Sequence, residues 1–206
     1  MSTPRVIAGK ARGIRLQDVP GDITRPITDM VKGALFNILG VETIQSTWLD
    51  LFGGTGSVGI EALSRGASYV RFVDLNRAAV NVIKANLEKT KLAEDAEVVQ
   101  SDAFAAMRQL AGIGQPKMVR GKHMPAFPKL DKRSFDLVFL DPPRYAKSPF
   151  GVVDIVNDYA ALTKPALLCT SEGGTLICCN NAAEVSRDAW ADQLARCAAK
   201  VGRTIR

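Results

Sequence analysis

The chain of 206 residues is poor in cysteine and histidine and has no long apolar run. Its four cysteines all lie in the last quarter, without C-x-x-C pairs, at Cys169, Cys178, Cys179 and Cys197. This spacing argues against a disulfide framework or a zinc site. No stretch approaches ~18 apolar residues and no signal-peptide core follows the first residues, so neither a membrane span nor secretion is expected. We therefore expect a cytoplasmic protein without metal, monomeric or weakly dimeric.

The composition is that of a basic globular protein. Apolar residues make up 47% of the chain and charged residues 23%, with a formal net charge of +6. The length suits one domain with a small appendage. We expect a hairpin and loop over residues 1–27 and the main domain over residues 28–206. The positive charge favours an anionic partner such as nucleic acid.

The first 27 residues carry the candidate nucleic-acid contacts. Residues 5–19 predict two short strands around a glycine-containing turn. Basic side chains are interleaved along this hairpin, at Arg5, Lys10, Arg12 and Arg15. A helix should then begin at Thr28, which can cap it. Its expected apolar stripe is Val31, Leu35, Ile38 and Leu39.

From residue 46 onward the pattern alternates between strands and helices. Strands are expected at 47–52, 69–75, 96–102, 135–143 and 175–180, and helices at 57–65, 76–90, up to Leu110, 151–168 and 184–200. This alternation predicts an α/β fold, a doubly wound and mainly parallel Rossmann-like sheet with helices on both faces. The chain stops where a sixth strand would begin, so the C-terminal strands are expected to be incomplete.

A basic stretch over residues 112–134 interrupts this alternation. It has three prolines and six Lys or Arg residues against one Asp, and it contains the lone His123. Structureless loops longer than about 12–15 residues are usually functional or disordered. Two readings stay open, a solvated insertion and an RNA-contacting loop.

A glycine-rich loop follows the first strand of the alternation. Gly54, Gly56 and Gly59 satisfy G-x-G-x-x-G between a strand and a helix. Glycines let a backbone turn tightly and approach a ligand closely. The pattern alone also fits a dinucleotide site, in which the helix N-terminus would hold a pyrophosphate.

Carboxylates at the ends of three strands change that balance. Asp50, Asp74 and Asp102 each stand where open α/β sheets bind ligands, and Asp74 can accept bonds from ribose hydroxyls. An acidic cradle without phosphate-binding groups suits S-adenosylmethionine, which carries a sulfonium and an ammonium. The alternative for each Asp is a helix cap or turn former. The candidate cofactor residues are Asp50, Phe52, Gly53, Gly54, Thr55, Gly56, Asp74, Leu75, Asp102 and Ala103.

The fourth strand ends in Asp141-Pro142-Pro143, followed by Arg144 and Tyr145. An amino group on a base is a poor nucleophile because its lone pair is delocalised. The Asp141 carboxylate and the Pro142 carbonyl can accept its two hydrogens and point the lone pair at a methyl donor. An aromatic side chain such as Tyr145 can stack on the base, worth roughly 1–3 kcal/mol. The alternative is a rigid loop exit made by two prolines.

At these residues the chain resembles the RsmD-type small-subunit rRNA guanine-N2 methyltransferases. The matching segments are RVIAGKARGIRL, TRPITDMVKGALFNIL, LDLFGGTGSVGIEALSRGASYVRFVD and FDLVFLDPP. The resemblance implies a seven-stranded class I methyltransferase sheet and methyl transfer to guanine N2 of small-subunit rRNA or the small ribosomal subunit. It also implies cofactor contacts from Asp50, Asp74 and Asp102, and catalysis by Asp141, Pro142 and Pro143. The segment Thr24-Arg25-Pro26 would close over the cofactor, and Arg25 joins the RNA-binding candidates.

The resemblance weakens after the two prolines. The family usually has Phe or Tyr where this chain has Arg144, and DPPRYAKSPF looks more like enzymes acting on cytosine C5 or guanine N7. The cytosine type needs a cysteine nucleophile, because C5 must be activated covalently. That place falls on Asn181, and Cys178 and Cys179 are read as small buried strand residues. NAD-linked oxidoreduction and a noncatalytic RNA-binding role are the readings outside this enzyme class.

Overall fold

The computed structural model describes residues 3–21, 27–114, 127–148 and 150–204. Its centre is a five-stranded sheet in the order β3-β2-β1-β4-β7, in which all neighbouring strands are parallel. Its strands are β1 (Thr47–Leu51), β2 (Tyr69–Asp74), β3 (Ala96–Gln100), β4 (Phe135–Leu140) and β7 (Thr170–Cys178). A separate antiparallel hairpin pairs β5 (Tyr145–Ser148) with β6 (Gly151–Asp154).

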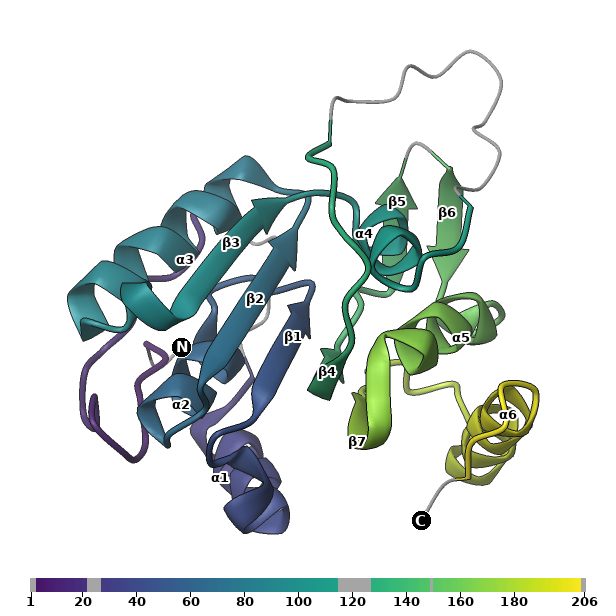
Figure 1. Cartoon of the computed structure of the whole chain (residues 1–206), viewed down its shortest axis with the longest axis horizontal. Helices are drawn as coiled ribbons and strands as arrows, with labels where there is room; N and C mark the ends of the chain where they lie inside the picture. Colours follow the sequence, from purple (N-terminus) through teal and green to yellow (C-terminus); the bar gives the residue numbers. More distant parts are fainter. Residues whose placement is uncertain (1–2, 22–26, 115–126, 149, 205–206) are drawn as a thin grey trace.

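Helices cover both faces of this sheet. They are α1 (Asp29–Leu39), α2 (Ser57–Ser64), α3 (Arg77–Thr90), α4 (Ala103–Leu110), α5 (Tyr159–Cys169) and α6 (Arg187–Ala199), with short 3-10 turns η1 (Gly40–Thr43) and η2 (Ala93–Asp95). One buried cluster joins α1, α2 and α3 to the sheet, and a second joins α4 and α5 to its other face. Helix α6 packs outside α5 (Figure 1). The predicted doubly wound fold is confirmed.

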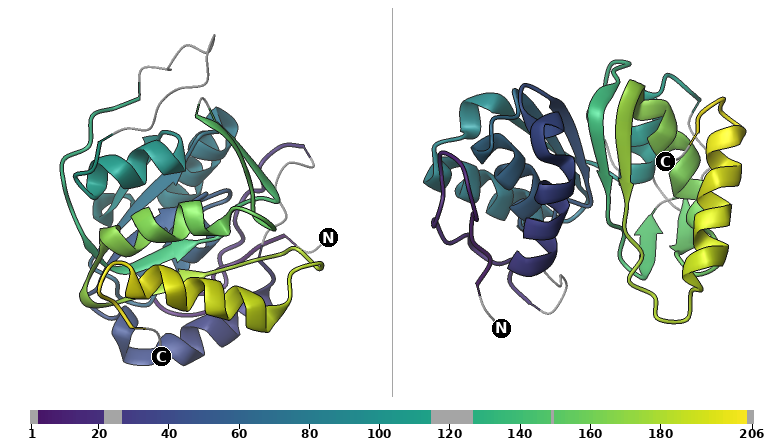
Figure 2. Two further views of the ribbon diagram at one scale, coloured as in Figure 1. Left: turned by 90° about the vertical axis from the view of Figure 1, so that its right-hand side faces the viewer. Right: turned by 90° about the horizontal axis from the view of Figure 1, so that it is seen from below.

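The N-terminal segment, residues 3–21, lies against the helix layer formed by α1, α2 and α3 (Figure 2). The predicted hairpin is present as a single antiparallel bridge between Arg5 and Arg15, flanked by backbone bonds such as Val6 N–H to Ile14 O at 2.9 Å. Val6 and Leu16 are buried in the same cluster as the sheet residues. The segment therefore shares the core of the main sheet.

Helix α1 begins as predicted, but its buried face differs from the predicted stripe. Thr28 caps it by accepting a bond from the Val31 N–H at 3.3 Å. Val31 and Ile38 are exposed, and the buried residues are Lys32, Phe36 and Leu39. The apolar residues of α1 are spread around its circumference, so their spacing does not identify one buried face. Lysine is also rarely fully buried, so Lys32 was not expected in the core.

The predicted helix over 151–168 is wrong in its first half. Residues Gly151–Asp154 form β6, and α5 starts only at Tyr159. Asp154 explains the break, because its side chain accepts bonds from the Val156 N–H and the Asn157 amide. This local bonding competes with helix formation, and α5 follows as a separate element.

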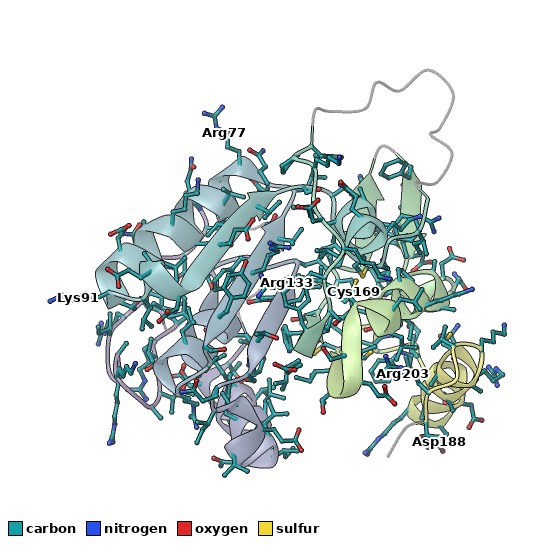
Figure 3. The ribbon with its side chains drawn as sticks, viewed as in Figure 1. Arg77, Lys91, Arg133, Cys169, Asp188 and Arg203 are labelled. Atoms are coloured by element: carbon teal, nitrogen blue, oxygen red, sulfur yellow. The ribbon has the colours of Figure 1, made fainter. Side chains whose placement is uncertain are left out.

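The described C-terminal end folds back onto the sheet. The Arg203 guanidinium donates to the carbonyl oxygens of Thr170 and Ser171 at 2.9 and 2.7 Å, at the start of β7 (Figure 3). Within the described residues no strand follows α6, and β7 stands at the edge of the sheet. No helix in that part of the chain is long and apolar enough to cross a membrane. Most of the basic stretch, with His123, lies outside the described residues.

Candidate active site

The segment predicted to bind the cofactor, residues 53–56 (the cofactor loop below), connects β1 to α2. Gly54 and Gly56 have φ of +55° and +76°, values that favour glycine. Gly59 serves another purpose, because a Cβ there would come within 2.3 Å of the Phe72 ring. Its glycine lets α2 pack directly on β2. The motif is thus used for two turns and one close packing contact.

Asp50 lies on β1 directly below the loop. It is 2% exposed, and its Oδ2 accepts a bond from the Gly59 N–H at 3.0 Å. Burial raises the pKa of Asp50 to about 8, and the nearby carboxylates of Asp141 and Asp74 add to the rise. This carboxyl group is therefore placed where a cation would stabilise its ionised form.

Asp74 ends β2 and Asp102 lies two residues after β3, and both have structural bonds of their own. Asp74 accepts bonds from the Gly54 N–H at 2.9 Å and the Asn76 N–H at 2.8 Å, and so fixes the loop. Asp102 is the N-cap of α4 and accepts from the Ala105 N–H at 2.9 Å. Burial raises the pKa of both. Both alternatives are therefore observed: Asp74 forms a turn with Asn76, and Asp102 caps α4.

Asp141 joins this group through the strand register. Leu51 pairs with Val73 on one side and with Leu140 on the other. The next residues along the neighbouring strands, Asp74 and Asp141, therefore flank the end of β1. Burial raises the pKa of Asp141, and a bond to Oδ1 from the Asn181 amide at 3.1 Å opposes that rise.

The remaining predicted cofactor residues line the same strand ends. Phe52 is half-buried with φ of +62°, and Thr55 is buried. Gly53 is half-buried, Ala103 begins α4, and Leu75 is 38% exposed. The structure therefore brings all ten predicted cofactor residues to the carboxyl ends of β1, β2 and β3.

The chain becomes exposed within two residues of Asp141. Pro142 is buried, whereas Pro143 is exposed and Tyr145 is 52% exposed at the start of β5. Arg144 forms a bidentate contact with Glu184 at 2.8 and 2.9 Å. Arg144, where the sequence departs from the family pattern, thus connects the start of the β5–β6 hairpin to the segment before α6. Its guanidinium also lies over the Tyr145 ring, 5.5 Å from the ring centroid.

The cysteines near this site are poor nucleophiles. Burial raises the pKa of both Cys178 and Cys179 to about 12, so both are neutral thiols near pH 7. Both are half-buried and pack on the core. Cys178 ends β7 and Cys179 follows it directly, and both side chains are less buried than predicted.

Sequence reasoning missed the contact made by Asn181. The residue was considered only as the place of an absent nucleophile, yet its amide holds Asp141. Its signal was the Asn-Asn pair after a strand end, a position from which an amide reaches the neighbouring strand.

The predicted RNA-binding residues lie apart from the carboxylates. Lys10, Arg12 and Arg15 are exposed. Arg5 is also exposed, but its Nε pairs with Asp29 at 2.7 Å. Arg25 lies outside the described residues.

The strand-end carboxylates fit a positively charged ligand. In the described ranges no lysine or arginine forms an ion pair with Asp50, Asp74, Asp102 or Asp141. Buried carboxylates without a counter-charge are unfavourable, so a bound cation would relieve the cost. A diphosphate would add negative charge to the same place. The donor set therefore suits a sulfonium cofactor better than a dinucleotide.

Comparisons with known proteins agree on one family. The family model described as conserved hypothetical protein 95 matches residues 4–119. The chain is 33% identical over 166 residues to the ribosomal RNA small subunit methyltransferase D of Escherichia coli K12, covering 80% of this chain and 72% of that protein. It is 39% identical over 140 residues to the protein of the same name from Haemophilus influenzae, covering 68% and 63%.

Solved structures share the fold. A hypothetical protein of Thermus thermophilus superposes with a TM-score of 0.62 at 27% identity, over 84% of each chain. A SAM-dependent methyltransferase of Agrobacterium tumefaciens gives a TM-score of 0.61 at 20% identity, over 80% of this chain and 48% of that one, which shows the fold alone. With the match of the family model and the identities to its named relatives, the chain belongs to the RsmD-type family of rRNA methyltransferases.

Proposed function

We propose that this protein transfers a methyl group from S-adenosylmethionine to the exocyclic N2 amine of a guanine in small-subunit rRNA. The observation that carries the proposal is the position of Asp141. It ends β4 beside the carboxylates of β1 and β2, and the Asn181 amide orients it. The relatives named small subunit methyltransferase D supply the substrate class.

The strand ends would hold the cofactor, which supplies an electrophilic methyl group when bound. Asp74 lies at the end of β2, where a carboxylate accepts bonds from ribose hydroxyls. Asp50 gives the positive groups a negative environment. The cofactor loop brings backbone close to the ligand, because Gly54 and Gly56 lack a Cβ.

The target amine would be gripped by two acceptors. Asp141 Oδ and the Pro142 carbonyl accept the two N–H bonds and direct the nitrogen lone pair toward the methyl group. Methylation makes the nitrogen positively charged until it loses one proton, which the Asp141 carboxylate can accept. Such positioning supplies much of the rate in group transfer. The base must leave its stack to reach the site, and Tyr145, whose side chain is 52% exposed, would stack on it.

Basic side chains of the N-terminal segment would hold the RNA backbone. Lys10, Arg12 and Arg15 are exposed and belong to the same folded unit as the cofactor loop. Contacts of this kind position a nucleic acid without reading its sequence.

Two measurements test the proposal. Calorimetry should detect binding of S-adenosylmethionine, and tritiated methyl groups should pass to unmodified small-subunit rRNA or to small subunits. NADH binding without S-adenosylmethionine binding would overturn the enzyme class. Cofactor binding without methyl transfer to either RNA substrate would instead support the noncatalytic reading.

A further inference from the structure

Two buried polar side chains outside the site connect the N-terminal segment to the cofactor loop. They are Asn86 of α3 and Lys32 of α1, and each is 0% exposed. Neither contacts the four strand-end carboxylates described above. Both bond to the backbone of the N-terminal segment; Asn86 also bonds to the cofactor loop, and Lys32 to the first residue of α2.

Asn86 makes its connection through a single amide group. Its Oδ1 accepts from the Gln17 N–H at 2.7 Å, and its Nδ2 donates to the Gln17 carbonyl at 3.1 Å. The same Nδ2 donates to the Thr55 carbonyl at 2.9 Å. Thr55 lies between Gly54 and Gly56 of the cofactor loop. One side chain thus fixes the end of the N-terminal segment and the middle of the loop.

Lys32 makes the second connection, at the first residue of α2. Its Nζ donates to the Arg5 carbonyl at 2.6 Å and to the Ser57 hydroxyl at 2.8 Å. It also lies 3.6 Å from the Glu61 carboxylate, an ion pair in which both side chains are fully buried. Ser57 is the first residue of α2, directly after the loop.

Helix α2 is itself bound closely to the N-terminal segment. Glu61 accepts bonds from the Ile7 and Ala8 N–H groups at 2.7 and 3.0 Å. A Cβ on Gly9 would lie 1.8 Å from the Ser64 carbonyl oxygen, so the two backbones are in direct contact. A shift of the segment would therefore displace the helix that begins at the cofactor loop.

We propose that Lys32 and Asn86 are positioning residues that couple the RNA-binding N-terminal segment to the cofactor loop. This rests on the proposed function, since it requires that the segment binds RNA and the loop binds cofactor. A ligand that orders the N-terminal segment or the cofactor loop then also orders the other, because these bonds connect the two. Cofactor occupancy then raises the affinity for RNA, and by linkage RNA raises the affinity for cofactor by the same factor.

The coupling separates these residues from those that serve one ligand. Loss of an exposed arginine such as Arg12 should weaken RNA binding alone. Asn86→Leu and Lys32→Met remove the bonds to both partners and leave backbone or hydroxyl groups without them. Lys32→Met also removes one cation from the buried Glu61 carboxylate, which keeps Arg65. We expect each to weaken both affinities by about tenfold, the size of one lost buried hydrogen bond with its unpaired partner.

The experiment measures S-adenosylhomocysteine binding by calorimetry and binding of unmodified, in vitro transcribed small-subunit rRNA by filter assay. Thr90→Val is the matched control, because Thr90 is buried on the same helix and its hydroxyl bonds only to the Asn86 and Leu87 carbonyls. It should change neither affinity by more than about twofold. In the wild-type chain, saturating S-adenosylhomocysteine should tighten rRNA binding by about fivefold or more.

The wild-type arm decides the question even where a variant fails to fold. Equal rRNA affinity with and without S-adenosylhomocysteine would overturn the coupling. So would folded variants that lose one affinity only, or a Thr90→Val variant that loses both. A wild-type chain that binds no S-adenosylhomocysteine would instead refute the proposed function, and the coupling with it.

Discussion

The carboxyl ends of the strands and the N-terminal segment carry opposite charges in opposite environments. Asp50 and Asp102 are buried and Asp74 and Asp141 are partly buried, without counter-charges among the described residues. Arg12 and its basic neighbours stand in solvent. Buried charge is costly until a ligand matches it, whereas exposed charge acts through salt-screened contacts. One region is therefore suited to select a ligand and do chemistry, and the other to attract and position a polyanion.

The largest expected effect is at the strand ends, where Asp141 is proposed to act on the target amine. Asp141→Ala should lower turnover by roughly 10²-fold or more, as the loss of one preorganised polar contact does, while S-adenosylmethionine affinity changes little. Single-turnover methyl transfer and calorimetry measure the two quantities. An unchanged turnover in a folded variant would remove Asp141 from its assigned role.

The pH dependence of cofactor binding should be the next largest effect. The pKa of Asp50 is raised to about 8, so the free protein holds this proton near pH 7. A bound cation favours the carboxylate, so binding releases the proton and affinity rises with pH toward about 8, by at most about tenfold per unit. In the ligand-free protein the free energy of unfolding has the opposite pH dependence to the cofactor affinity. The folded state holds a proton that the unfolded chain lacks, so stability falls as pH rises from about 4 to about 8.

Calorimetry at three pH values, in buffers of different ionisation enthalpy, measures the affinity and the proton release. Asp50→Asn is the control, because it cannot titrate and should flatten the profile. A flat profile in the wild-type chain would show that the strand-end charge does not match a cationic ligand in the way described.

A smaller effect is expected at the basic end. Arg12→Ala should weaken rRNA binding about threefold to tenfold and reduce the salt slope by about one, without changing cofactor affinity. Arg187→Ala removes the same charge from exposed α6, on the other side of the molecule (Figure 1), and should have less effect. Equal losses in the two variants would mean that net charge alone attracts the RNA.

The smallest effect is expected at the cysteine beside the site. Cys179→Ser should keep turnover within about twofold, since a thiol with a pKa of about 12 is not a nucleophile at neutral pH. The methyl-transfer assay measures it. A folded but inactive variant would favour the cytosine C5 reading.

Much of the fold could be predicted because its signals are local. The strands are buried apolar runs, and turn residues separate them from amphipathic helices such as α3. Wrong assignments came where two local rules competed. Asp154 bonds to the backbone that follows it and delays α5 to Tyr159. Apolar residues around α1 concealed that its buried face includes Lys32.

The sequence predicted which residues lie at the strand ends, but not the side-chain hydrogen bonds that connect them to the rest of the fold. The G-x-G-x-x-G spacing and the four aspartates were visible in the sequence. The Asn181 contact with Asp141 and the Asn86 contact with Thr55 were not, because each joins residues 31 or more positions apart. Such contacts depend on strand order and helix packing, which periodicity does not specify.

The most direct test of the proposed grip on an amine is the position of the added methyl group. Small-subunit rRNA treated with the protein and S-adenosylmethionine can be digested and its nucleosides analysed by mass spectrometry. We expect N2-methylguanosine, formed roughly 10²-fold more slowly in the Asp141→Ala reaction. 5-Methylcytidine or 7-methylguanosine as the product would contradict this expectation. Cytosine C5 and guanine N7 carry no amino group whose two hydrogens Asp141 and the Pro142 carbonyl could accept.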